Sequence, residues 1–318
     1  MSAVPQINDR KRRIEFKQIL IATDFSDASQ RAFDYAVAIA HRYGSTVFIV
    51  HAMAPDPREP VPIYPLPREL DRGRLEAEER MKQLAQDPRI QDLNLQLVLE
   101  QGPVWDVLSP VIQRENVDLL VLGTRGRGGL KKLALGSVAE VVLRLAPRPV
   151  LTIGPKAPLA GAASTEFKRI LFATDLGPTS TQAFPYALSM AEDYGAQLVL
   201  LHMVPPMPLP ELGPAMCVPA VYGAEEVANW EETTRAESAK KLRELLPPNT
   251  KLAAEPEYVV GTDFVPEGIL DVAAAHSIEL IVMGADRTSA PRLAAHIPWD
   301  LTHEVICHAK CPVLTVGN

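Results

Sequence analysis

Residues 16–51 read FKQILIATDFSDASQRAFDYAVAIAHRYGSTVFIVH, and residues 167–202 read FKRILFATDLGPTSTQAFPYALSMAEDYGAQLVLLH. The two stretches align without gaps at an offset of 151 residues, with 16 identities in 36 positions. The match resumes further along, where 118–123 (DLLVLG) resembles 279–284 (ELIVMG) and 148–153 (RPVLTI) resembles 311–316 (CPVLTV). A period of this length is that of a compact domain, so the chain is a duplicated domain and not a solenoid.

A short segment rich in proline, glycine and alanine separates the two copies, beginning at Gly154. It carries no helix or strand pattern, which is typical of a linker. We therefore predict a first domain over residues 1–155, a linker over 156–165 and a second domain over 166–318. The total of 318 residues agrees with two domains of average size.

Strand-like and helix-like patterns alternate within the first copy. The apolar residues of 27–43 recur at helical spacing, and Gly44 follows as a helix stop. The continuous apolar run 117–122 is typical of a buried parallel strand. The whole pattern predicts an α/β fold, a doubly wound five-stranded parallel sheet in each copy. Ligands of such sheets bind beyond the carboxyl ends of the strands.

Composition excludes several classes of protein. The chain is 47% hydrophobic and 22% charged, which is ordinary for a globular protein. Its net charge of −7 argues against a nucleic acid as partner, because phosphate contacts need clustered lysine and arginine. Three cysteines are too few for a disulfide framework, and no apolar run is long enough to span a membrane or to act as a signal peptide. We expect a cytoplasmic protein with no membrane partner.

Proline is concentrated at two equivalent places. Of the 29 prolines, 12 fall in the loops 55–67 and 205–219, each after the second predicted strand of its copy. Proline restricts φ and lacks an N–H donor, so both loops are expected to be stiff and extended. Two interpretations remain open: a plain surface connection, or a cover or partner surface beside the ligand cleft.

A glycine-rich loop follows the fourth predicted strand, from Gly123 to Ser137, with the spacing G-x2-G-x9-G-S. Glycine lets backbone approach a ligand, and Ser137 as an N-cap would open a helix whose N–H groups and dipole attract an anion. Positive charge comes from Arg125, Arg127, Lys131 and Lys132. The loop predicts a phosphate site that is neither a Walker A loop nor a dinucleotide fingerprint, with a tight but empty turn as the alternative.

Together with its surroundings, this loop resembles the ATP-binding signature of the universal stress protein family. Further resemblance lies in 21–24 (IATD), in His51 and in 146–150 (APRPV). It covers both copies and leaves out the first dozen residues and the linker. It implies domains like those of the adenine-nucleotide α-hydrolases, packed as an intramolecular pseudo-dimer through the last strands, Val150–Ile153 and Val313–Val316. A further homodimer stays open.

The resemblance also implies an ATP molecule lying across the strand ends, with Mg²⁺ bound through it. Ala22, Thr23 and Asp24 would line the base and ribose, and Val50 would pack against adenine. The ribose and phosphates would follow Gly123, Arg125, Gly126 and Gly128, and the terminal phosphates would meet Gly136, Ser137 and Val138. Asp24 would be the magnesium contact, since Mg²⁺ prefers few carboxylates plus phosphate oxygens. A helix cap or loop role is the alternative for Asp24.

The second copy departs from this pattern in its loop. Ala173, Thr174, Asp175, His202 and Gly284 are retained. The positions of Gly126, Gly136 and Ser137, however, are held by Arg287, Trp299 and Asp300. A large indole and a carboxylate at the helix start oppose phosphate binding, so we expect no ATP there in the usual mode. Arg287 and Arg292 leave a different anion open.

Histidines and cysteines gather near the C-terminus: His296, His303, Cys307, His308 and Cys311. A zinc site would need four converging ligands, so we favour buried or surface residues without metal. Cys217 lies in a proline-rich loop with no partner that would support a redox role.

The sequence raises three candidate functions. The first is an ATP-binding stress sensor or regulator that is not an enzyme and hydrolyses ATP slowly at most. The second is an interaction scaffold that does not use nucleotide. The third, an ATP pyrophosphatase, needs a Ser-Gly-Gly loop after the first strand, where this chain has 23–27 (TDFSD). No residue suggests a general base, because His51 and His202 recur in the intact and the degenerate copy alike. We favour the first function.

Overall fold

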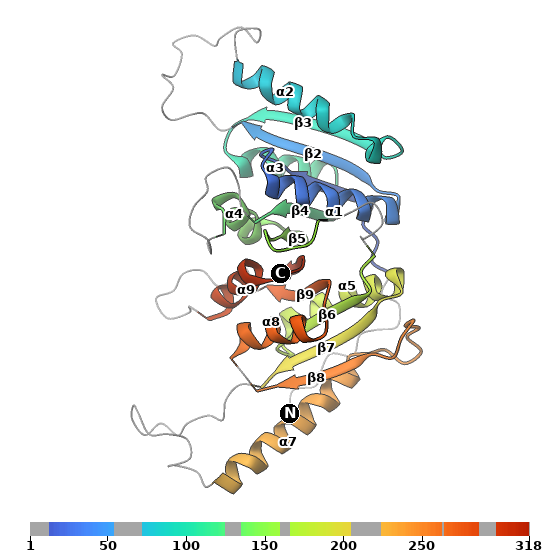
Figure 1. Ribbon diagram of the computed structural model, residues 1–318, viewed down its shortest axis with the longest axis vertical. Coiled ribbons are helices and arrows are strands. Elements are labelled where there is room, and N and C mark those ends of the chain that lie inside the picture. The colour runs from blue at the N-terminus through green and yellow to red at the C-terminus, as the bar shows by residue number, and fades with distance from the viewer. Residues whose placement is uncertain are drawn as a thin grey trace, which may run out of the picture. The chain divides into compact units, whose positions relative to one another are not determined.

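The computed structural model describes residues 13–53, 72–124, 135–159, 166–204, 224–262, 264–285 and 297–317, with strands and helices alternating along the chain (Figure 1). Both proline-rich loops and Cys217 lie outside these residues, so the interpretations of those segments stay predictions. No helix in the described part of the chain is long and apolar enough to cross a membrane.

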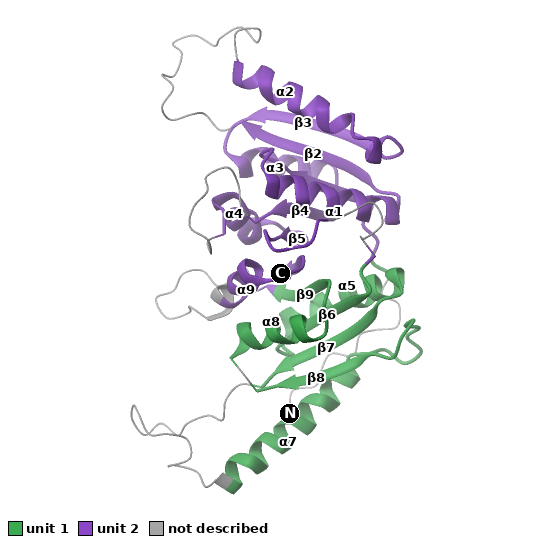
Figure 2. Ribbon diagram, viewed as in Figure 1, with its two compact units in different colours: residues 1–14, 167–284 green, residues 15–166, 285–318 purple. Residues whose placement is uncertain are grey.

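The residues cluster into two compact units, shown in different colours in Figure 2. The first-repeat unit comprises residues 15–166 and 285–318, and the second-repeat unit comprises residues 1–14 and 167–284. Each end of the chain therefore belongs to the unit built mainly from the other repeat. The predicted boundaries at 155 and 166 concern the sequence repeats, and they stay a prediction.

The first-repeat unit has one sheet of six strands in the order β3-β2-β1-β4-β5-β10. These are β1 (Gln18–Ala22), β2 (Thr46–Met53), β3 (Asn94–Gln101), β4 (Leu119–Gly123), β5 (Val150–Ile153) and β10 (Val313–Gly317). All neighbours are parallel except β5 and β10, which run antiparallel with Leu151 opposite Leu314. This confirms the expected pairing of the last strands of the two copies.

Two hydroxyl groups strengthen that antiparallel pair. Thr152 donates from Oγ1 to the carbonyl of Val313 at 3.1 Å, and Thr315 donates to the carbonyl of Val150 at 3.2 Å. Thr315 is completely buried, so its hydroxyl needs such a partner. The last strand of the second repeat is thus an integral part of the first-repeat sheet.

Helices connect the strands of this unit: α1 (Asp27–Tyr43), α2 (Arg72–Ala85), the 3₁₀ turn η2 (Pro88–Ile90), α3 (Val104–Arg114), α4 (Ser137–Leu145) and α9 (Ile297–His308). The sequence pattern explains α1 well. Ser26 caps its start by accepting a hydrogen bond from the N–H of Ser29, and Gly44 ends it at a φ of 62°. Its buried face, with Ala32, Ala36 and Ile39 among others, packs on the sheet.

The second-repeat unit has strands in the order β9-β6-β7-β8, all parallel. The strands are β6 (Arg169–Thr174), β7 (Gln197–Met203), β8 (Glu257–Gly261) and β9 (Leu280–Ala285), and the helices are α5 (Pro178–Tyr194), α7 (Ala224–Glu244) and α8 (Val265–Ala275). Arg13 joins this unit through an ion pair with Asp193 of α5. The N–H of Ile14 donates to Oγ of Ser189 at 3.1 Å, which ties the same segment to α5.

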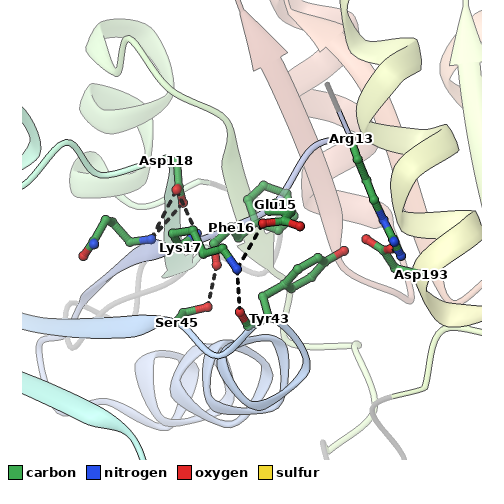
Figure 3. A network of polar contacts seen from close by, with 9 residues as sticks. Arg13, Glu15, Phe16, Lys17, Tyr43, Ser45, Asp118 and Asp193 are labelled. Atoms are coloured by element: carbon green, nitrogen blue, oxygen red, sulfur yellow. Dashed lines mark hydrogen bonds and ion pairs between the residues drawn. The ribbon is translucent and has the colours of Figure 1, made fainter. Parts of the chain in front are cut away.

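One carboxylate fixes the backbone at the start of β1 (Figure 3). Asp118, just before β4, accepts hydrogen bonds from the backbone N–H groups of Lys17 at 2.8 Å and Gln18 at 3.2 Å. Burial raises the pKa of the Asp118 carboxyl above its usual range, although these two N–H groups act in the opposite direction. In the second repeat Glu279 does the same for Lys168 and Arg169. The motif was not anticipated from the sequence.

Candidate functional site

The carboxyl ends of β1, β2 and β4 meet at one edge of the first-repeat sheet. The register places Ala22 opposite Val50 and Ile21 opposite Val121, so Thr23 and Gly123 lie at the same level of adjacent strands. Val50 is almost completely buried, and Ala22 is half-buried. The sequence-predicted base and ribose residues are therefore brought together, at the edge where a doubly wound sheet binds its ligands.

The turn after β1 is fixed by its own polar side chains. The N–H of Thr23 extends the pairing with β2 by donating to the carbonyl of Val50 at 3.0 Å. The hydroxyl of Thr23 donates to Ser29 at 3.1 Å and accepts from the N–H of Phe25 at 3.0 Å. Phe25 has a φ of 59°, the left-handed region that bulky residues rarely occupy. The turn is thus held in a costly conformation, a feature common at ligand sites.

Asp24 is the residue expected to contact magnesium. It is half-buried, and its Oδ1 accepts a hydrogen bond from the N–H of Ser26 at 3.0 Å. This is an Asx turn. The cap of α1 is Ser26, so of the two structural alternatives for Asp24 the loop role applies and the cap role does not. Ser26 and Ser29 were not among the predicted site residues, although a serine just before an amphipathic run is a recognised start signal for a helix.

His51 supports the same turn from β2. Its Nδ1 lies 2.7 Å from the carbonyl oxygen of Thr23, and its ring packs on Phe25 with centroids 4.4 Å apart. A carbonyl only accepts, so Nδ1 carries the proton. His202 makes the equivalent contact with Thr174 at 2.8 Å in the second repeat. Occurrence of this bond in both repeats agrees with the expected structural role.

Gly123 is required by packing, whatever ligand is bound. A Cβ on Gly123 would lie 2.6 Å from the carbonyl carbon and oxygen of Ala28, at the start of α1. Gly284 stands in the same relation to the backbone of Ser180 at the start of α5. The first glycine of the motif therefore lets a helix start approach the strand end. The family resemblance, by contrast, implies only a contact of Gly123 with the ribose and phosphates.

A backbone hydrogen bond joins the two ends of the glycine-rich loop. The N–H of Gly136 donates to the carbonyl of Thr124 at 2.8 Å, and the N–H of Thr124 donates to the carbonyl of Ile153 at 3.0 Å. Thr124 is buried, so both ends of the loop are anchored to the sheet. The loop itself, with Arg125, Gly126, Gly128 and the predicted basic residues Arg127, Lys131 and Lys132, lies outside the described residues.

The start of α4 differs in one respect from the expectation. Its N-cap is Gly136, with φ −68° and ψ 147°, and Ser137 is the first helical residue. The prediction of Ser137 as the N-cap is therefore wrong. Because glycine has no side chain, the cap makes no side-chain hydrogen bond to the first-turn N–H groups. Ser137 and Val138 are exposed, so this helix start faces solvent.

Asp175 of the second repeat forms the same kind of turn as Asp24. Oδ1 of Asp175 accepts hydrogen bonds from the N–H of Gly177, at 2.8 Å, and from the hydroxyl of Ser180. Ser180 also lies 2.8 Å from Oγ1 of Thr174. The carboxylate is thus bonded to the first turn of α5. The side chains of Trp299 and Asp300, and all of Arg287 and Arg292, lie outside the described residues, so the expected loss of ATP binding stays a prediction.

The cluster of histidines and cysteines near the C-terminus shows no metal geometry where it is described. His303 and Cys307 of α9 lie 3.8 Å apart between Nε2 and Sγ, and both Cys307 and Cys311 are buried. Among the described residues, no three histidine, cysteine or acidic side chains are placed to hold a metal ion. His296 lies outside the described part of the chain.

Known proteins share both the sequence and the fold. A universal stress protein from Thermus aquaticus is 38% identical over 141 residues, which is 43% of this chain and 98% of that protein. One from Methanocaldococcus jannaschii is 32% identical, over 43% of this chain and 82% of that protein. The crystal structure of a universal stress protein from Archaeoglobus fulgidus covers 94% of this chain and 98% of its own, with a TM-score of 0.64 and 20% identity.

The family model of universal stress proteins matches the chain twice, over residues 15–154 and 166–317. The two matches together span nearly all of the chain and coincide with the two sequence repeats. The chain therefore belongs to the universal stress protein family, as a tandem pair of its domains.

Proposed function

We propose that this universal stress protein is a nucleotide-dependent regulator whose first repeat binds ATP with Mg²⁺ and whose second repeat does not. The observation that carries the proposal is the start of α4. Its first-turn N–H groups have no side-chain cap, and the loop before it is anchored between Thr124 and Gly136. N–H groups without a side-chain cap, at the positive end of a helix, attract phosphate.

The base and ribose would lie over the turn after β1. Ala22, Thr23 and Asp24 line this edge, and the buried Val50 lies opposite Ala22 in β2. Gly123 and the loop residues Arg125, Gly126 and Gly128 would follow the ribose and phosphates, and Gly136, Ser137 and Val138 would meet the terminal phosphates. The fit is supported by the absence of a side chain at Gly136, where backbone would come close to the ligand.

Asp24 would hold the magnesium ion, which neutralises charge on the phosphates when bound. Its carboxylate is half-buried at the edge where the phosphates would run, and one of its oxygens is oriented by the N–H of Ser26. One carboxylate plus phosphate oxygens and water is a usual magnesium environment.

A regulatory role fits the histidine geometry better than an enzymatic one. His51, the histidine at the strand ends, donates from Nδ1 to a backbone carbonyl, and His202 does so identically. Both therefore brace their turns, which favours binding with slow hydrolysis at most. The acidic net charge and the low cysteine content favour a cytoplasmic location and no nucleic-acid partner.

Calorimetry with ATP and Mg²⁺ tests the proposal. Gly136→Trp, which copies the second repeat into the first, is expected to abolish binding by the folded protein. Val141→Trp is the matched control, because it puts the same indole on an exposed position of α4 about one turn away, and it should bind normally. An unchanged affinity of Gly136→Trp for ATP would contradict the assignment of the site.

An interaction scaffold that does not use nucleotide is the alternative function. Chromatography of the supernatant after denaturing purified protein distinguishes the two. Co-purified adenine nucleotide supports the regulator. A protein that carries none and gives no calorimetric signal with ATP and Mg²⁺ is a scaffold.

A further inference from the structure

A side chain of α2 reaches the turn that carries the candidate site. The guanidinium carbon of Arg80, in α2, lies over the ring of Phe25 at 5.6 Å from the ring centroid. A cation at this distance from an aromatic face is attracted by the ring quadrupole. Phe25 stands between Asp24 and Ser26, next to the residues that are proposed to meet the nucleotide. Arg80 thus connects α2 to the site.

The ring of Phe25 connects Arg80 to the backbone of the turn. It packs on His51 with centroids 4.4 Å apart, and Nδ1 of His51 donates to the carbonyl of Thr23 at 2.7 Å. The N–H of Phe25 itself donates to Oγ1 of Thr23 at 3.0 Å. A shift of the ring would therefore displace Thr23 and Asp24, which are proposed to line the base and ribose.

The second repeat makes the same turn without an aromatic ring. Leu176 occupies the position equivalent to Phe25, with a φ of 61° against 59° for Phe25. Its N–H donates to Oγ1 of Thr174 at 2.9 Å, as that of Phe25 does to Thr23. The left-handed turn therefore does not need the ring. Because the ring and its arginine belong to the repeat that is proposed to bind ATP, we assign them a role in binding and not in the shape of the turn.

Few apolar contacts hold α2 on the sheet. The helix packs on β3 (Figure 1), and Ala77 and Met81 are the two buried residues among its 14, all of which the structure describes. Leu75 of the same helix is 46% exposed. Segments that bury little apolar surface open at a low free energy. The contact of Arg80 with Phe25 is therefore a substantial part of what holds α2 and the turn together.

We infer that Arg80 is a positioning residue of the nucleotide site, which acts through Phe25 and makes ATP affinity depend on the docking of α2. The inference rests on the proposed function and adds a means of its regulation. Coupling between two sites is reciprocal, so bound ATP should in turn hold α2 on the sheet. Any change that loosens α2 should weaken ATP binding.

Calorimetry of the full chain with ATP and Mg²⁺ tests the inference. Arg80→Ala should lower the affinity about two- to fivefold, the effect of losing a partly exposed cation–π contact. Arg80→Lys keeps a cation near the ring and should recover part of the loss. Arg74→Ala is the matched control, because it removes the same charge from the same helix, where Arg74 pairs with Glu78 at 3.0 Å. Its affinity should equal that of the wild type, and thermal melts establish that each variant is folded.

A double-mutant cycle distinguishes positioning from direct contact with the nucleotide. Phe25→Leu copies Leu176 of the second repeat into the first. In that background Arg80→Ala should cause no further loss of affinity, because Arg80 acts through the ring. An equal loss in both backgrounds would mean that Arg80 acts on the nucleotide without Phe25, and it would overturn the inference.

Hydrogen exchange tests the reciprocal effect. ATP should slow the exchange of the α2 amides in the wild type and much less in Arg80→Ala. A wild type that binds ATP without a change in α2, an Arg80→Ala variant of unchanged affinity, or an equal loss in Arg74→Ala overturns the inference and leaves the proposed function standing. A wild type that binds no ATP overturns the proposed function and this inference with it.

Discussion

Gly123, the last residue of β4, lies against the backbone of Ala28 in the first turn of α1, with no space between them for a Cβ atom. The first glycine of the loop motif is thus explained by helix–strand packing before any ligand is considered. Gly284 and Ser180 repeat the relationship in the second repeat, where the rest of the motif is lost. A glycine needed for packing is thus retained where the rest of the loop motif differs.

Gly123→Ala is therefore expected to destabilise the protein in the absence of nucleotide, by about 1–3 kcal/mol through overpacking. Gly284→Ala should do the same. Gly154→Ala is the control, since its Cβ would meet Ala309 at an ordinary 3.5 Å, and it should be nearly neutral. Chemical denaturation without ATP measures all three. Full stability of Gly123→Ala would show that the glycine serves only the ligand.

The start of α4 provides a second prediction, in which stability and binding change in opposite directions. Ser137→Asp puts a carboxylate in the first turn, where it should stabilise the nucleotide-free protein by about 0.3–1 kcal/mol through the helix dipole. The same charge should weaken ATP binding by about tenfold or more. Ser137→Asn has the same shape without the charge and should change affinity far less. Thermal melts and calorimetry compare the pair; equal affinities for the two variants would count against phosphate at this helix start.

A cluster around Arg89 ties the η2 turn to α1. Its guanidinium donates to Asp87 at 2.7 Å and to Asp34 of α1 at 2.9 Å, and lies over the ring of Phe33. Arg89→Ala should destabilise the protein by about 1 kcal/mol, a modest value because the pair is partly exposed. Arg114→Ala, which removes an exposed arginine paired with its sequence neighbour Glu115, is the comparison and should cost almost nothing. Urea unfolding of both variants gives the difference; equal values would mean that the cluster is an ordinary surface feature.

The pH dependence of the Arg89 cluster follows from the same contacts. The Arg89 hydrogen bond lowers the pKa of Asp87, so the carboxylate is favoured in the folded state. Its stabilising contribution is present above the ordinary pKa of 3.8 and is lost as the pH falls through the lower folded value. The wild-type protein should lose stability to acid more steeply than Arg89→Ala in this range. Equal slopes of unfolding free energy against pH in the wild type and Arg89→Ala, below pH 3.8, would contradict the assignment.

The contribution of Asp118 to stability depends on pH in the opposite direction. Burial raises its pKa, so the charged form is disfavoured on folding, and its contribution declines as the pH rises from 3.8 through the folded pKa. Its Oδ2 accepts from both Lys17 and Gln18, so Asp118→Ala should cost about 1–3 kcal/mol by leaving two N–H groups unpaired. Asp118→Asn retains an acceptor and should cost less, with a flatter pH profile. Denaturation at several pH values measures this, and equal losses in both variants would show that the acceptor is unimportant.

Local sequence patterns were sufficient to predict much of the fold. The repeat, the alternation of strand and helix, the start of α1 at Asp27 and its stop at Gly44 all follow from residues within a few positions of one another. They were predicted because helix and strand periodicity and glycine stops act over short distances. The edge of the sheet that carries the candidate site could then be predicted as well, because parallel strands place their carboxyl ends together.

Contacts between distant residues decided the rest. That Gly136 and not Ser137 caps α4, that Asp118 holds Lys17, and that Gly123 meets Ala28 depend on segments brought together only in the folded chain. The same is true of the compact units, in which β10 completes the first-repeat sheet although it is the last strand of the second repeat. The sequence by itself determined the family and the duplication, and it predicts a phosphate site in the glycine-rich loop. The tertiary structure alone decided which backbone groups are left for a ligand, because a hydrogen bond between distant residues leaves no periodic signal in the sequence.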